Sequence, residues 1–134
     1  MSEKKRVPQT IQDLYEMLIE NGDIIGKIEF DDDYILWRFK EFWLYIFLDQ
    51  NEGYISVNRR KKHWWEQEQL FHWHPMKEEI YDQLRSIGNK NNVLVIRNGS
   101  LGSDIFYLGR EDEYKYSPNK KWHWGKLYYL KPQD

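Results

Sequence analysis

Three histidines fall close together in the stretch HWWEQEQLFHWHP, where they could bind a metal ion. If Glu66–Gln69 forms the loop of a β-hairpin, His63 lies opposite His72, and His74 follows on the same face. Imidazoles on one strand face suit zinc or another transition metal, with His123 or a water molecule as the fourth ligand. The pattern therefore raises a metal site with His63, His72 and His74 as its ligands.

The histidine face has a plainer interpretation, which the sequence favours. No carboxylate lies at a diagnostic spacing and no HExxH motif is present, so the favoured expectation is that no metal binds. The histidines then form an exposed polar face, with His74 capping the next helix, or a proton-sensitive or partner-contacting surface. Alternation places the other hairpin side chains, with Trp65 and Leu70 beside the histidines and Trp64, Phe71 and Trp73 toward the core.

Basic residues beside aromatic residues suggest a second kind of site. The run Arg59-Arg60-Lys61-Lys62 precedes Trp64 and Trp65, and Lys120–Trp124 has a similar composition. Such residues bind single-stranded nucleic acid through phosphate contacts and base stacking. The chain has 20 Lys and Arg against 22 Asp and Glu, so a solvated loop is favoured over a nucleic-acid site. The candidate binding residues of the whole chain are Arg59, Arg60, His63, Trp65, His72, His74, Trp122 and Trp124.

Other motifs that would carry catalysis are missing from the sequence. The turn Asn98–Gly102 has two glycines but neither the lysine nor the following helix of a phosphate-binding loop. Asp31–Asp33 lacks the interleaved glycine and distal glutamate of a calcium loop. No serine stands in a nucleophile elbow, and cysteine is absent. We therefore assign no catalytic residue and no cofactor, and favour a binding function over an enzymatic one.

Apolar residues at helical spacing predict two helices. Thr10 can cap the first, which ends at Asn21-Gly22. The second begins near Pro75 and ends at Gly88. The apolar residues expected on the two buried faces are Ile11, Leu14, Leu18 and Ile19 in the first helix, and Met76, Ile80, Leu84 and Ile87 in the second.

Alternating and fully apolar segments predict the strands. Residues 24–30 and 34–39 alternate and flank the turn at Asp31–Asp33, which predicts a hairpin. Trp43–Leu48 is apolar at every position, which predicts a central strand covered on both faces. Further strands are expected in the histidine hairpin and at residues 54–57, 93–96, 105–108 and 122–130. The predicted fold class is α+β, a mainly antiparallel sheet with two helices packed on it, in the order α-β-β-β-β-(β)-α-β-β-β.

Length and composition set the domain organisation. With 134 residues, the chain is expected to form a disordered lead over residues 1–9 and a single α+β domain over residues 10–134. The start MSEKKRVPQT lacks the apolar run of a secretory signal. The six residues Trp43–Leu48 are far fewer than the roughly 20 that cross a membrane. We therefore expect a cytoplasmic protein without membrane contact.

The favoured function is a non-enzymatic protein-binding module. The chain holds 7 Trp, 10 Tyr and 6 Phe, and aromatic side chains with arginine dominate many protein interfaces. In size, acidity and aromatic content the chain resembles the small intracellular immunity proteins that neutralise bacterial toxins, which implies another protein as the partner. A metal-binding protein or metal-dependent enzyme, and a single-stranded nucleic-acid-binding module, are the alternatives. The oligomeric state stays open.

Overall fold

A computed structural model describes residues 6–20, 24–59, 69–100, 102–114 and 125–132. The elements within these residues are α1 (Ile11–Ile19), β1 (Lys27–Asp31), β2 (Tyr34–Arg38), β3 (Phe42–Leu48), β4 (Gly53–Arg59), β5 (Gln69–Trp73), α2 (Ile80–Ile87), β6 (Asn92–Gly99), β7 (Gly102–Arg110), α3 (Glu111–Tyr114) and β8 (Lys126–Leu130). The fold is α+β and its sheets are antiparallel, as predicted. No helix in the described part of the chain is long and apolar enough to span a membrane.

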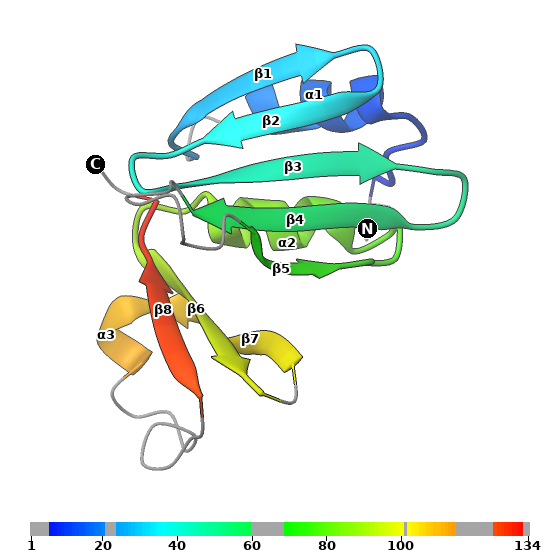
Figure 1. Ribbon diagram of the computed structural model, residues 1–134. Helices are drawn as coiled ribbons and strands as arrows, with labels where there is room; N and C mark the ends of the chain where they lie inside the picture. The colour runs from blue at the N-terminus through cyan, green and yellow to red at the C-terminus, as the bar shows by residue number, and fades with distance from the viewer. Residues whose placement is uncertain (1–5, 21–23, 60–68, 101, 115–124, 133–134) are drawn as a thin grey trace, which may run out of the picture.

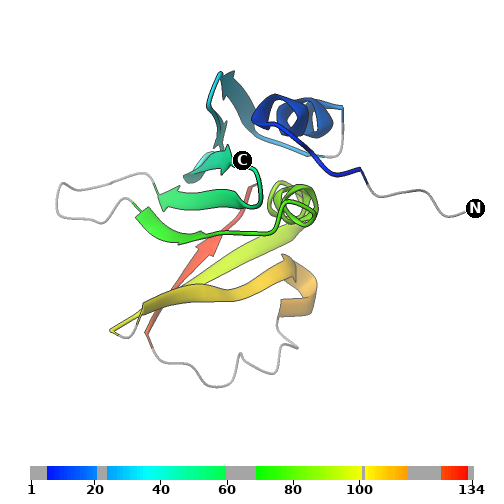
Figure 2. The same cartoon turned by 90° about the vertical axis from the view of Figure 1, so that its right-hand side faces the viewer.

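The first five strands form one sheet in the order β1-β2-β3-β4-β5. Both longer helices, α1 and α2, lie on the same side of this sheet, behind it in Figure 1 and to its right in Figure 2. No described helix or strand lies over its other side in either view. We call the two sides the covered face and the open face.

The covered face holds the main core. Ile35, Trp37, Leu44, Ile46 and Ile55 point to it and are fully buried. They join one hydrophobic cluster with the buried residues of both longer helices, which include Leu14, Leu18, Ile80, Leu84 and Ile87. Burial of large aliphatic and aromatic side chains is the dominant favourable term in folding, so this face carries most of the stability of the sheet.

Trp37 of β2 packs against the C-terminal end of α2. Its indole Nε1 donates a hydrogen bond to the carbonyl oxygen of Ile25 at 2.8 Å. The ring lies so close to Gly88 that a Cβ atom there would approach it to 2.4 Å. Gly88 follows α2 as predicted, and the close approach of Trp37 gives a second reason for glycine at this position.

The first helix matches the prediction except at its end. The backbone N–H of Asp13 donates to the hydroxyl oxygen of Thr10 at 3.0 Å, so Thr10 is the N-cap. Leu14 and Leu18 are fully buried, but Ile19 is 53% exposed and its predicted burial is wrong. Met17 is buried instead. It lies three residues after Leu14, so it shares the helix face of Leu14 and Leu18.

The second helix starts later than predicted. It begins at Ile80 rather than near Pro75, and Met76 is 60% exposed, so the prediction that Met76 lies on the buried face is wrong. The carbonyl oxygen of Pro75 accepts a hydrogen bond from the N–H of Gly53, and Met76 forms an isolated bridge with Glu52. These bonds hold the chain beside β4, which delays the first helical turn.

The strand β3 is central, as predicted, but it is not covered on both faces. Its residues alternate between buried and partly exposed, and Phe47 on the open face is 40% exposed. The continuous apolar run misled the prediction because aromatic residues on the open face have the same apolar character as core residues. Trp43, Tyr45 and Phe47 are the side chains concerned.

The remaining strands form a second sheet rather than extending the first. Its order is β7-β6-β8, and it packs against α2 and β5. Residues 93–96 are buried on both faces, as predicted, with Leu94 and Ile96 in the main core and Val93 and Val95 in a second cluster. The short helix α3, which carries Tyr114 into that second cluster, was not predicted.

The leading segment is described from Arg6 onward. Pro8 is buried, and the Arg6 guanidinium lies 2.7 Å from the carboxylate of Asp13 on α1. The hydrogen bond to Asp13 raises the pKa of Arg6. Residues 1–5 of the predicted lead lie outside the described part of the chain.

Candidate binding face

The histidine strand β5 pairs with β4, which sets the neighbours of both described histidines. Ser56 is the partner of His72, Val57 of Phe71 and Ile55 of Trp73. Gln69 pairs with Asn58 and belongs to β5, so its predicted place in a hairpin loop is wrong. The predicted pairing of His72 with His63 involves a residue outside the described part of the chain.

An irregularity in this ladder turns Leu70 into the core. The pairing shifts between Val57 and Asn58, which leaves Leu70 as an extra residue in β5. Leu70 is buried in the main cluster, so its predicted place beside the histidines is wrong. A bulge shifts by one residue which side chains face the core, so the alternation differs before and after it. Neither strand has a glycine at the bulge that would have predicted it.

Beyond the bulge, the strand alternates as predicted. Phe71 and Trp73 stack at 5.4 Å and pack against the main core, and the indole Nε1 of Trp73 donates to Gln83 on α2 at 2.7 Å. His72 and His74 are exposed, with ring centroids 6.0 Å apart. His74 does not cap α2, because that helix begins later and the residue at its N-cap position is Glu79.

The two histidines continue a row of aromatic rings that crosses the open face. The ring of Tyr34 stacks on Tyr45 at 5.1 Å, and Tyr45 meets Tyr54 edge-on at 6.1 Å. Tyr54 then stacks on His72 at 5.5 Å and contacts His74 edge-on at 5.3 Å. We call these five residues the aromatic row. They come from β2, β3, β4 and β5 and from the residue that follows β5.

Further apolar side chains widen this row. Leu36 is the strand partner of Tyr45, Trp43 is the partner of Asn58, and Phe47 is the partner of Tyr54. All three are partly or largely exposed. The open face therefore has an apolar, aromatic centre.

The rings of the aromatic row stand against one another, which limits what they can bind. Tyr34, Tyr45, Tyr54 and His72 already use ring faces or edges on their neighbours. A nucleobase stacks on an open ring face, so these four side chains form a poor base-stacking platform. The three tyrosines combine an apolar ring with a hydroxyl group, which suits contact with a protein surface.

The candidate residues for nucleic acid are only partly described. The guanidinium of Arg59 lies 5.0 Å from the centre of the Tyr128 ring in β8, and the ammonium of Lys126 lies 4.8 Å from the same ring. Both cations therefore contact an aromatic side chain of the chain itself. Arg60, Trp65, Trp122 and Trp124 lie outside the described part of the chain.

The described histidines alone do not make a metal site. His72 Nδ1 lies 3.0 Å from Nε2 of Gln69, and His74 Nδ1 lies 3.7 Å from a carboxylate oxygen of Glu52. Among the described residues no group of three potential ligands could hold a metal ion. The three-histidine site stays a prediction, because His63 is outside those residues.

The turn between β3 and β4 carries acidic residues next to this face. The backbone N–H groups of Glu52 and Asn51 donate to the Asp49 carboxylate at 2.7 and 2.8 Å. These bonds stabilise the charged form and lower the pKa of Asp49. This margin of the open face is therefore fixed and negatively charged at neutral pH.

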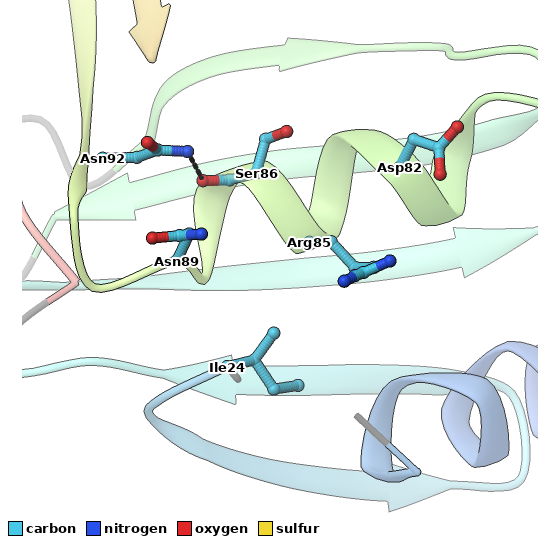
Figure 3. A pocket seen from close by; sticks show the side chains of 6 residues that line it. All are labelled: Ile24, Asp82, Arg85, Ser86, Asn89 and Asn92. Carbon is cyan, nitrogen blue, oxygen red and sulfur yellow. Dashed lines mark hydrogen bonds between the residues drawn. The ribbon is translucent and has the colours of Figure 1, made fainter. Parts of the chain in front are cut away.

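A small hollow lies away from the open face, beside α2 (Figure 3). Its volume is about 270 Å³, and its lining consists of Ile24, Asp82, Arg85, Ser86, Asn89 and Asn92. Asn92 donates to the backbone carbonyl oxygen of Ser86 at 2.8 Å, which braces the end of the helix. No motif in the sequence indicated this hollow, and the lining shows no nucleophile held against a base.

Comparison of the chain with protein-family models, with curated proteins and with solved structures found no match. The likeness to immunity proteins therefore stays a prediction from size and composition. The open face is the candidate site that the fold itself presents.

Proposed function

We propose that this protein is a non-enzymatic protein-binding module of the immunity or antitoxin type, and that its contact surface is the open face of the five-stranded sheet. The observation that carries the proposal is the aromatic row, which crosses a sheet face that no described helix or strand covers. Exposed apolar patches rimmed by polar residues mark interaction surfaces in soluble proteins.

The composition of the open face supports a protein as the partner. Its centre holds Trp43, Tyr45, Phe47 and Tyr54, and tyrosine and tryptophan are enriched among the residues that dominate protein interfaces. Its margins are charged or polar. An apolar centre with a polar rim is the usual arrangement of such an interface.

Two observations favour a protein over the alternatives. Within the aromatic row Tyr34 stacks on Tyr45 and Tyr54 stacks on His72, which leaves fewer ring faces for base stacking. The described histidines have Gln69 and Glu52 as polar neighbours and form no group of three potential ligands with other described residues.

The proposal predicts that removing exposed rings abolishes partner capture without unfolding the chain. The test uses immobilised wild-type protein and a Tyr45→Ala, Tyr54→Ala double variant to capture partners from the cells that make the protein. A matched control is Tyr129→Ala, which removes an exposed tyrosine from β8 in the other sheet. Circular dichroism establishes that each variant keeps the fold.

The captured protein is then identified by mass spectrometry, produced separately and titrated against all three forms. A partner that binds the wild type and Tyr129→Ala equally, and the double variant at least about tenfold more weakly, supports the proposal. Equal binding by all three folded forms rejects the open face as the contact surface. A toxin domain among the captured proteins would support the immunity type in particular, and its inhibition by this chain is the decisive assay for that type.

A further inference from the structure

Charged residues of opposite sign gather at the two ends of the strands in the five-stranded sheet. The turns β1–β2 and β3–β4 lie together at the right in Figure 1, and the opposite strand ends lie at the left. We call the first the acidic end, which holds Asp31, Asp32, Asp33, Asp49 and Glu52. We call the second the basic end, which holds Lys27, Arg38 and Lys40.

Each end also contains charges of the opposite sign, but these do not reverse the sign of its net charge. Glu29 and Glu41 lie at or near the basic end, and Glu29 pairs with Lys27 at 3.7 Å and with Arg38 at 3.4 Å. His74 and Lys77 lie near the acidic end and act on Asp49. The open face thus has an aromatic centre, a negative end and a positive end.

We infer that the open face is self-complementary and binds a second copy of this chain in a twofold-symmetric dimer. The relevant axis runs parallel to the face and across the strands, through the middle of β3. Rotation by half a turn about it brings two open faces together and reverses the strand direction of one copy. The acidic end of each copy then meets the basic end of the other, as an isologous interface requires.

In this dimer each acidic turn of one copy lies over basic residues of the other. The axis keeps each strand at its own position across the sheet, so the β1–β2 turn of one copy lies over the start of β1 and the end of β2 in the other. Asp31–Asp33 therefore face Lys27 and Arg38. The β3–β4 turn, with Asp49 and Glu52, faces Lys40 in the same way. Tyr45, at the middle of β3, lies at the centre of the interface.

The size of the face predicts weak association. Five strands spaced by about 4.8 Å, each with five to seven residues rising about 3.3 Å, cover a footprint of about 500 Å². A standard stable interface buries about 800 Å² per partner, so this dimer is expected to be concentration-dependent. The charged ends make it sensitive to salt, because ionic strength screens exposed pairs.

This inference rests on the open face of the proposed function but concerns a different occupant. A dimer of this kind keeps the aromatic row out of water until a partner displaces the second copy. The two ideas fail separately, because self-association is measured on the purified chain alone and partner capture is measured with the partner.

The experiment measures the mass of the full-length chain by sedimentation velocity over a wide concentration range at low salt. One variant reverses the acidic end with Asp31→Lys, Asp32→Lys and Asp33→Lys, and the other reverses the basic end with Lys27→Glu and Lys40→Glu. All five side chains are exposed, so the folds are expected to persist, which circular dichroism checks.

The wild type is expected to dimerise, and each variant alone is expected to dimerise at least about tenfold more weakly because its two ends carry like charges. An equal mixture of the two variants is expected to restore a heterodimer, because one copy is then positive at both ends and the other negative. Phe47→Ala, which changes no charge, is expected to weaken every pairing.

A wild type that stays monomeric at all concentrations overturns the inference. So does a dimer that the charge reversals leave unchanged, because it must then use another surface. Variants that dissociate but do not recover on mixing also overturn it, since the proposed orientation requires recovery. Partner capture that depends on Tyr45 and Tyr54 in a chain that never dimerises would leave the proposed function standing and remove this inference alone.

Discussion

The two faces of the five-stranded sheet use the same strands in different ways. On the covered face, Trp37, Leu44 and Ile46 are fully buried under α1 and α2. On the open face, their strand neighbours Leu36, Tyr45 and Phe47 keep part of their surface exposed. Both sets are apolar, so the difference lies in which elements cover them and not in the chemical type of the side chains.

This comparison separates stability from function. The covered face is packed by both longer helices, and changes there are expected to affect folding. The open face has no described helix packed on it, and its ring contacts are worth about 0.2–1 kcal/mol per cross-strand pair. Side chains on the open face are therefore free to serve binding at small cost to the fold.

The largest expected effect tests the comparison on two adjacent residues of β3. Replacing Ile46 by Ala should lower the free energy of unfolding by about 2–5 kcal/mol, because it empties a fully buried site. Phe47→Ala, its matched control on the open face, should cost less than about 1 kcal/mol. Chemical denaturation of both variants gives the two values. Equal costs would show that the open face is packed as firmly as the covered one.

A glycine on the covered side gives the next largest effect. Gly88→Ala should cost about 1–3 kcal/mol, because the new Cβ atom would lie 2.4 Å from the Trp37 ring. A Trp37→Phe change removes the ring atoms in that contact. Denaturation of the double variant should therefore show a cost below the sum of the two single changes, whereas simple additivity would contradict the steric explanation.

The second sheet extends the comparison to a smaller core. Burial, together with a hydrogen bond to Tyr129, raises the pKa of Tyr114 to about 12. Because the folded chain favours the neutral phenol, this stabilisation is complete below about pH 10 and is lost as the pH rises through about 12. Thermal melts between these values should show falling stability, with a shallower fall in Tyr114→Phe. An equally steep fall in that variant would show that a group other than Tyr114 causes the pH dependence of stability.

The smallest expected effect concerns an ion pair across β6 and β7. Arg97 binds both carboxylate oxygens of Asp104, at 2.9 and 2.8 Å. Asp104→Asn should cost about 0.2–1 kcal/mol, less at high salt. The exposed pair of Arg110 and Asp112 supplies the control, and Asp112→Asn should cost less than Asp104→Asn in the same denaturation assay. A larger cost for Asp112→Asn than for Asp104→Asn would contradict the expectation that the more buried ion pair contributes more stability.

Local patterns in the sequence predicted most elements of the fold. The cap at Thr10, the buried residues Leu14 and Ile80, and the hairpin around Asp31–Asp33 follow from spacing alone. The errors arise where tertiary contacts decide the outcome. Pro75 stays beside β4 instead of starting α2, and a bulge turns Leu70 inward, and neither event has a local signal in the sequence.

The candidate site was predicted in part. Alternation placed His72 and His74 on one face, but the aromatic row that continues from them depends on the order of strands in the sheet. Tyr34, Tyr45 and Tyr54 come together only because β2, β3 and β4 are neighbours, which a single sequence does not state. An apolar run such as Trp43–Leu48 also does not reveal whether a second layer covers it.

The affinity of a purified partner for two exposed-ring variants tests the central claim most directly. Phe47 on the open face and Tyr129 on the other sheet are 40% and 49% exposed, so their replacement by Ala removes comparable surface. Isothermal titration should show binding at least about tenfold weaker for Phe47→Ala and unchanged for Tyr129→Ala. Unchanged binding by Phe47→Ala, together with a loss in Tyr129→Ala, would contradict the assignment of binding to the open face.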